Sequence, residues 1–234
     1  MDLKKELEIC FRKNENKKLS DAIFDVLLSA ILTGDFTPDT KINMLNLSNI
    51  FEVSISPVKY AILKLNDIGL VQFNKNKGAF VTFFDKQDYM DMFYFRMTLE
   101  ALAASQAALL MTAEEVDHLF NLVKKLEIIS NELKIMGINI IPLIPFELTK
   151  ADNDFHTYVV EHSGNAYLIK QYKKLYPKIY FSRRFITIPE SLNYIDEHYS
   201  LAYSIKSKDP EFAYSTFIHH SQTSLYYYKK KITV

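Results

Sequence analysis

The sequence has few of the residues that cross-link or punctuate a chain. Its 234 residues include one cysteine, five glycines, seven prolines and no tryptophan. The single cysteine, Cys10, cannot form an internal disulfide, which excludes a small disulfide-stapled fold. We therefore expect a reducing compartment, the cytoplasm, and the start of the sequence carries no charged and then apolar signal segment.

Long apolar runs and an excess of one charge are also missing. The most apolar loop, residues 135–146, is interrupted by Gly137, Pro142 and Pro145 and falls short of the roughly 20 residues that a membrane-spanning helix needs. No membrane span is expected. With 28 basic and 28 acidic residues the net charge is zero, so contact with DNA would require a local basic patch.

Hydrophobic residues make up 48% of the chain, which is enough to bury one large core or two ordinary ones. Apolar residues recur at three- and four-residue steps from Leu19 to Ile31 and predict a helix with one buried face. Ser20 and Asp21 are expected as its N-terminal capping groups, and Gly34 as its end. Shorter helical patterns follow at about 43–51 and 56–68.

The hydrophobic period changes after Gly69. Two strand-like runs, 70–73 and 79–83, flank a turn-forming segment and predict a β-hairpin. A helix, a helix-turn-helix and a hairpin in this order describe a winged helix-turn-helix domain over residues 19–84. Residues 1–18 are mostly charged and predict a frayed helix or arm, an N-terminal extension of open role.

Residues 86–230 lack strand signals and predict an antiparallel, all-helical bundle. Asp209 followed by Pro210 is a strong helix start, with Asp at the N-cap and Pro in the first turn. The predicted fold class is therefore mostly α, with a winged helix-turn-helix followed by a helical bundle. The expected helices of the bundle span roughly 86–109, 113–135, 147–163, 165–184, 191–208 and 210–229.

The second helix of a helix-turn-helix places its first residues against base edges in the major groove, while flanking groups hold phosphates. Here that start offers Ser54, Ser56 and Lys59 for binding DNA. Residues 41–84 carry five lysines against two acidic residues. The alternative is an ordinary pair of amphipathic helices with a solvated, lysine-rich turn. The tip of the hairpin adds three further DNA-binding candidates: Lys75, Lys77 and Gly78.

Four segments of this region, ILTGDFTPDTKI, VSISPVKYAI, LNDIGLV and NKGAFV, follow one another from residue 31 to residue 81. Together they resemble the winged helix of the GntR family of regulators, and the resemblance covers residues 19–84. It implies a homodimer that reads double-stranded DNA, with two recognition helices on the half-sites of a pseudo-palindromic operator.

The chain departs from the GntR pattern in the helix that reads DNA. The family usually has an arginine where this chain has Ile55, an acidic residue at Tyr60 and often an arginine at Lys59. Arginine reads guanine with two hydrogen bonds, whereas isoleucine makes only apolar contact, for example with a thymine methyl. We therefore expect an operator that depends little on guanine and is rich in A·T pairs. The alternative is a divergent sensor with weak or no DNA binding.

An acidic residue and three histidines of the bundle are spaced so that they could lie on facing sides of its helices. Asp152 and His156 are four residues apart and share one helical face. His198 lies 11 residues before Asp209 and His220 lies 11 after it, so in an antiparallel pair both stand about 16 Å from the turn and level with each other.

One carboxylate and three imidazoles suit a divalent transition metal such as zinc, nickel or manganese. The alternative is that these are ordinary surface or core histidines. The spacing gives no metal role to three others: His118, His162 and His219.

The segments YFRMTLE, DNDFH, SGN and EH, with Asp209 and Ala213, resemble the ligand-sensing C-terminal domain of the FadR subfamily over nearly all of residues 86–228. The resemblance implies a metal with a small organic acid effector docked on it. It assigns the metal to Asp152, His156, His198 and His220, and Asp154 is a less favoured alternative to Asp152.

The resemblance also implies effector-binding arginines. Arg96 is expected to clamp the effector carboxylate, or else to form an ion pair with Glu100 one turn away. Arg183 is a weaker candidate. The combined prediction is a homodimeric, ligand-responsive repressor. A metal-dependent hydrolase is the rival function, but the sequence shows no spare acidic residue at the spacing of known zinc hydrolase motifs.

Overall fold

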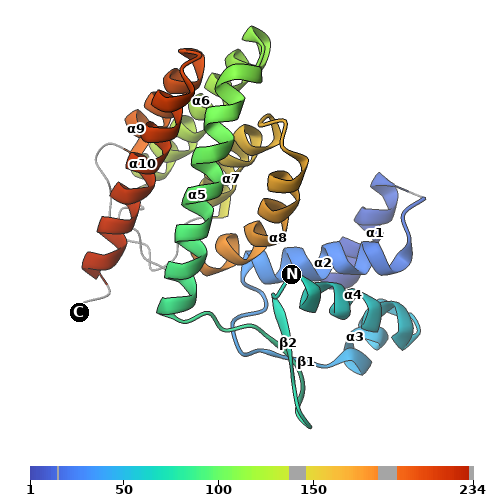
Figure 1. The fold of residues 1–234 in the computed structure, drawn as a ribbon. Coiled ribbons are helices and arrows are strands. Elements are labelled where there is room, and N and C mark those ends of the chain that lie inside the picture. Colours follow the sequence, from blue (N-terminus) through green and yellow to red (C-terminus); the bar gives the residue numbers. More distant parts are fainter. Residues whose placement is uncertain (15, 137–145, 184–193, 232–234) are drawn as a thin grey trace. The chain divides into compact units, whose positions relative to one another are not determined.

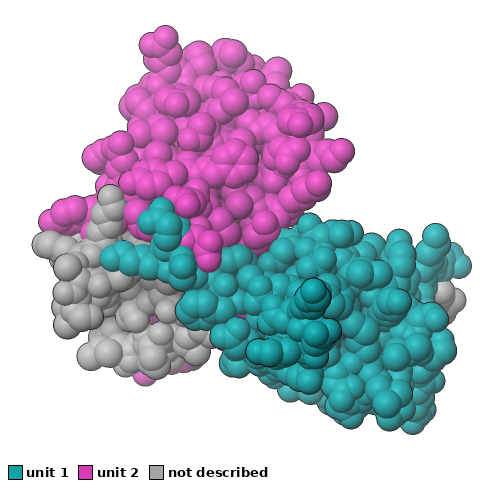
Figure 2. Space-filling view, turned by 60° about the horizontal axis from the view of Figure 1, so that its bottom comes forward, with its two compact units in different colours: residues 1–87 teal, residues 88–234 magenta. Residues whose placement is uncertain are grey.

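The structure is a computed structural model, and it describes residues 1–14, 16–136, 146–183 and 194–231 of the chain. The chain divides into two compact units, residues 1–87 and 88–234 (Figure 2). The mostly helical fold class predicted from the sequence is confirmed.

Unit 1 contains the predicted winged helix-turn-helix, with a third strand that the sequence did not predict. The strand β1 is two residues long, too short to display a period of two, and it pairs antiparallel with β3 to give the sheet order β1-β3-β2. The elements of unit 1 are α1 (Leu3–Lys13), α2 (Leu19–Thr33), β1 (Lys41–Ile42), α3 (Met44–Phe51), α4 (Ile55–Asp67), β2 (Val71–Asn74) and β3 (Gly78–Val81).

The core of unit 1 lies between α2 and α4, which pack against each other along their lengths. Ile23 and Ile31 of α2 and Ile62 of α4 are fully buried, and each such side chain contributes about 1.5–3 kcal/mol of hydrophobic free energy. Gly34 ends α2 with a φ of 84°, a left-handed conformation that glycine adopts without strain.

Two sequence-based expectations for unit 1 are wrong. Residues 3–13 form a regular helix, α1, whose Leu7 is buried and which packs on α2 and α3 instead of fraying. The N-cap of α2 is Lys18, without a side-chain cap, so Ser20 and Asp21 lie inside the helix. Asp21 instead accepts a hydrogen bond from Lys64 of α4 at 2.6 Å.

The described residues of unit 2 form helices joined by short turns, without a strand, and these helices begin and end within about three residues of the predicted bounds. Figure 1 shows α5 running beside α10, with the other helices packed behind and to one side of them. The helices are α5 (Lys86–Leu110), α6 (Ala113–Ile135), α7 (Phe146–Glu161), α8 (Ala166–Arg183), α9 (Tyr194–Lys206) and α10 (Pro210–Lys231).

The main core of unit 2 gathers side chains from α5, α6, α7, α9 and α10. Small residues of α5, such as Ala104 and Ala108, allow the larger Phe155 and Phe217 to pack close to this helix. Local capping sets where the helices start. Asp209 Oδ1 accepts the backbone N–H groups of residues 211 and 212, both at 3.0 Å, as the sequence predicted for α10.

Candidate functional site

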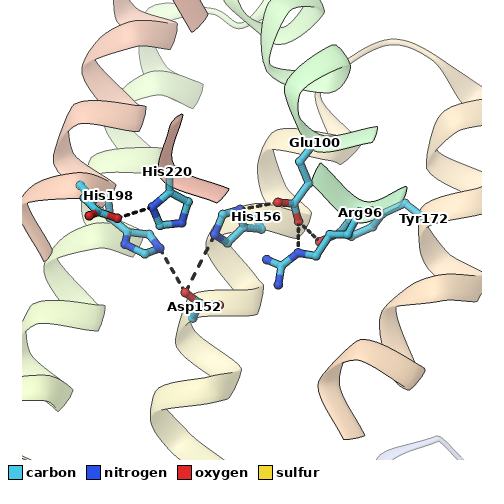
Figure 3. Close-up of polar contacts among 8 residues, drawn as sticks. Arg96, Glu100, Asp152, His156, Tyr172, His198 and His220 are labelled. Atoms are coloured by element: carbon cyan, nitrogen blue, oxygen red, sulfur yellow. Dashed lines mark hydrogen bonds and ion pairs between the residues drawn. The ribbon is translucent and has the colours of Figure 1, made fainter. Parts of the chain in front are cut away.

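Three buried histidines converge inside unit 2, one from each of three helices. His156 comes from α7, His198 from α9 and His220 from α10, and one ring nitrogen of each lies within 4.8 Å of the other two. Their exposed fractions are 1%, 0% and 7%. Figure 3 shows the three rings turned toward a common space. The three imidazoles share this space although they are far apart in the sequence, because α7, α9 and α10 contribute to one hydrophobic core.

The turn at Asp209 produces the facing pair that the spacing predicts. The helix α9 ends at Lys206 and α10 begins at Pro210, and the two helices pack along each other. The ring centroids of His198 and His220 are 4.9 Å apart. Equal distances from a tight turn therefore placed two imidazoles level with each other, as helix geometry requires.

Asp152 borders the three histidines. Its Oδ1 atom lies 3.1 Å from His198 Nε2 and 3.9 Å from His156 Nε2, and its side chain is only 2% exposed. Asp154, the alternative considered from the sequence, instead pairs with Lys150 at 2.6 Å and is partly exposed. Of the two aspartates considered, the one beside the histidines is therefore Asp152.

Two glutamates lie behind the histidine rings. Glu197 Oε2 accepts a hydrogen bond of 2.8 Å from His220 Nδ1, and Glu100 Oε2 lies 3.1 Å from His156 Nδ1. Carboxylates in such outer positions orient metal-binding imidazoles and fix their tautomers. Sequence reasoning did not assign these roles, although Glu197 directly precedes His198 and Glu100 is one turn from Arg96.

Burial controls the charge of the rings. Burial lowers the pKa of His156, more than the nearby Glu100 carboxylate raises it. Burial also lowers the pKa of His220 to about 4, and the neighbouring histidines add to the effect. Both rings are therefore neutral near pH 7 and carry a lone pair that can bind a cation.

The donor set fits a divalent transition metal. Neutral imidazoles and a carboxylate are typical ligands of zinc, nickel and manganese, and the glutamates behind the rings supply further negative charge. The residues that could hold such a metal are the four named from the sequence: Asp152, His156, His198 and His220.

Arg96 forms a buried ion pair with Glu100. Its Nε donates to Glu100 Oε1 at 2.6 Å, and the two side chains are 7% and 2% exposed. The Tyr172 hydroxyl donates to the same oxygen at 2.6 Å. Burial alone would raise the pKa of the Glu100 carboxyl, but the charge of Arg96 and the contact with His156 hold it well below its usual range.

The ion pair that the sequence offered as the alternative for Arg96 is thus present. It uses Nε, and in Figure 3 the end of the guanidinium points to the side where Asp152 and His156 lie. No hydrogen bond of its two terminal amino groups is found within the described part of the chain. Arg183 is the last residue of α8, and its side chain lies outside the described residues.

The three other histidines do not join the cluster, as expected from the sequence. His162 Nε2 lies 3.6 Å from Glu115. The His118 ring is 4.8 Å from that of Tyr158. His219 is exposed, whereas its neighbour His220 is buried.

The DNA-binding candidates are exposed in unit 1. Ser54 is the N-cap residue of α4, but its side chain makes no capping hydrogen bond. Ile55 and Tyr60 are 48% and 54% exposed, so the surface of α4 combines apolar and basic groups. The candidates that the structure leaves exposed on α4 or in the β2–β3 turn are Ser54, Ser56, Lys59, Lys75, Lys77 and Gly78.

Two family models match the chain. The model of bacterial regulatory proteins of the gntR family matches residues 19–81, and the FCD domain model matches residues 91–223. The boundaries of both matches agree with the division into a winged helix-turn-helix unit and a helical unit.

Two relatives in sequence are similar over most of the chain. The HTH-type transcriptional repressor GlaR of Escherichia coli is 26% identical over 192 residues, which cover 78% of this chain and 83% of GlaR. The HTH-type transcriptional regulator YdhC of Bacillus subtilis is 26% identical over 175 residues, covering 75% of this chain and 71% of that protein.

Solved structures share the fold. McbR/YncC of E. coli superposes with a TM-score of 0.74 at 18% identity, covering 92% of this chain and 99% of that one. Lar, which controls expression of the Listeria monocytogenes agr system, has a TM-score of 0.55 at 17% identity, covering 93% and 99%. None of the described helices combines the length and the apolar character that a membrane span requires.

Proposed function

Because this chain belongs to the GntR family of bacterial regulatory proteins and carries an FCD domain, we propose that it is a repressor controlled by a small organic acid bound at a metal. Like its relatives, the chain is a transcriptional regulator and not an enzyme. The hydrolase considered from the sequence is therefore rejected. GlaR is named as a transcriptional repressor, which supports the proposal that this chain represses transcription. A regulator of transcription would act in the cytoplasm.

The observation that carries the metal proposal is the convergence of three buried histidines within 4.8 Å. Two of the rings have a lowered pKa, so they offer lone pairs without first losing a proton. Asp152 would complete a set of four ligands and supply a negative charge.

The effector would bind beside these ligands. A bound divalent metal supplies a Lewis-acid centre that accepts a carboxylate oxygen. Arg96 would hold the same effector through its terminal amino groups, since Nε is engaged by Glu100. A planar guanidinium matches the geometry of a carboxylate, so an anion that carries a carboxylate suits this site.

The winged helix would bind an operator as a homodimer. Lys59 on α4 and Lys75 and Lys77 at the hairpin tip would contact phosphates, and Ser54, Ser56 and Gly78 would lie close to the DNA. Effector binding would favour one arrangement of the two winged helices over the other. Couplings of this kind typically amount to about 1–3 kcal/mol.

A sensor with weak DNA binding is the second candidate, because exposed Ile55 and Tyr60 replace polar base-reading groups on α4. A gel-shift titration at increasing salt separates the two. Specific binding that weakens steeply with salt supports the repressor. Micromolar or weaker binding that is the same for every sequence supports the second candidate.

Metal removal tests the central proposal. The purified protein should contain about one divalent metal ion per chain by elemental analysis, and chelation should change operator affinity and the response to organic acids. A protein that is free of metal after purification and after dialysis against zinc, nickel or manganese would refute the proposal.

A further inference from the structure

Three polar side chains stand at every fourth position of α7, beside the proposed metal ligands. Thr149, Asn153 and Thr157 share one face of the helix because four residues make slightly more than one turn. Thr149 and Asn153 are 2% and 1% exposed. One buried atom of each side chain has no hydrogen-bond partner in the described part of the chain: Thr149 Oγ1, Asn153 Nδ2 and Thr157 Oγ1.

Such a stripe is unusual for a protein interior. Buried polar groups are nearly always hydrogen-bonded, and an unsatisfied one lowers stability. Helical threonines elsewhere in unit 2 donate to the carbonyl four residues earlier, as Thr98, Thr216 and Thr223 do. Thr157 Oγ1 makes no such bond. The stripe therefore has hydrogen-bonding capacity that the helix itself does not use.

The stripe faces the ion pair that borders the proposed site. Val160, seven residues after Asn153 and so on nearly the same face, packs with Ala103 of α5 and Tyr172 of α8. His156, on the adjoining face, contacts Glu100 of α5. The polar groups of α7 thus face α5, which carries Arg96 and Glu100, and α8, which carries Tyr172.

We propose that Asn153 and Thr149 bind a second oxygen-bearing group of the effector, a hydroxyl or a second carboxylate. This inference rests on the proposed function, in which the metal and Arg96 hold the first carboxylate. The Asn153 Nδ2 group donates a hydrogen bond and so requires an acceptor, and the Thr149 hydroxyl can donate or accept. A monocarboxylate with an alkyl tail would offer neither group a hydrogen-bond partner.

Three acids of similar size test this specificity. Butanoate carries one carboxylate, 3-hydroxybutanoate adds a hydroxyl, and succinate adds a second carboxylate. Calorimetric titration of the metal-loaded, full-length protein should show at least one oxygenated acid binding about 10-fold or more tightly than butanoate, since a site built to hydrogen-bond a polar group rejects an analogue without it.

The variants Asn153→Leu and Thr149→Val remove the hydrogen-bonding groups while nearly keeping the shape. Asn153→Leu should reduce the preference to about 3-fold or less with unchanged metal content. It should also raise the melting temperature of the effector-free protein, because it removes an unsatisfied buried group. The control is Asn131→Leu at an exposed position on α6, which should preserve the preference.

The outcomes separate this inference from the proposed function. Equal binding of the three acids, or an unchanged preference in Asn153→Leu, overturns the inference and leaves the metal sensor standing. A lower melting temperature of effector-free Asn153→Leu also overturns it, because the amide would then be satisfied by bound water. A metal-loaded protein that binds none of the acids overturns the carboxylate effector together with this inference.

Discussion

Arg96 and Glu100 form a charged hydrogen bond of 2.6 Å between consecutive turns of α5, with both side chains almost fully buried. The pair is the hub of a network, because Glu100 also receives the Tyr172 hydroxyl and lies against His156. An ion pair on a solvated helix surface would contribute little to stability. Removing one partner of a buried pair, in contrast, strongly lowers the free energy of unfolding.

Glu100→Gln should therefore destabilise unit 2 severely. The variant keeps the shape of the side chain but removes the carboxylate to which buried Arg96 is hydrogen-bonded, at a cost of about 3–5 kcal/mol. Urea denaturation of the metal-free protein, followed by circular dichroism, measures the free energy of unfolding. The control Glu115→Gln should change it by less than about 0.5 kcal/mol, since glutamine also completes the capping box at the start of α6. Equal stabilities of the two variants would contradict the prediction.

His198→Ala should abolish tight metal retention while leaving the winged helix folded. His198 is fully buried and its Nε2 atom lies 3.1 Å from Asp152, so alanine removes one of four proposed ligands. The metal-to-protein ratio after gel filtration should fall from about one to near zero. His219→Ala, an exposed neighbour of the cluster, should retain the metal. An unchanged metal content in His198→Ala would refute the assignment of the ligands.

The metal-free protein should lose stability as the pH falls. The pKa of His220 is lowered to about 4 by burial, against about 6.5 in an unfolded chain. Between these values the unfolded chain binds more protons, so the stability contribution is complete above pH 6.5 and is lost toward pH 4. On the order of 3 kcal/mol is involved. Thermal melting between pH 7 and pH 4 measures the loss, which should be smaller in His220→Phe. A loss of the same size in this variant would contradict the role of His220.

Operator selection should return sites with few guanines. Ile55 is 48% exposed at the start of α4, where an apolar side chain meets thymine methyl groups but cannot read guanine. Selection from a random pool should give an A·T-rich consensus for the natural protein. Ile55→Arg should gain a guanine in each half-site, with discrimination of about 1–3 kcal/mol. A guanine-centred consensus for the natural protein would count against this prediction.

Lys59→Ala should weaken DNA binding uniformly across sequences. Lys59 is exposed one turn into α4 and is expected to contact a phosphate, so its loss should reduce the slope of log affinity against log salt by about one. Fluorescence anisotropy at several salt concentrations measures the slope. Lys124→Ala, exposed on α6 of the other unit, should leave it unchanged. The same slope in both variants would remove Lys59 from the interface.

Local patterns in the sequence were sufficient for most of the fold. Helical periodicity, capping residues and the change of period after Gly69 predicted the order of elements in both units. The predictions were incomplete or wrong in segments whose hydrophobic pattern is short or ambiguous. The strand β1 has two residues. In α1 only Leu7 is buried, so this segment has too few apolar positions to distinguish a packed helix from an arm.

The sequence by itself determined which side chains could meet within one helix or across one tight turn, because the rise and rotation of an α-helix are constant. That is why the pair on α7 and the level histidines of α9 and α10 were predictable. Only the tertiary structure decided that Glu100 stands behind His156, that Glu197 accepts a hydrogen bond from His220, and that the buried Asn153 Nδ2 group has no hydrogen-bond partner among the described residues. These relationships join distant segments, and they depend on how side-chain volumes let the helices pack.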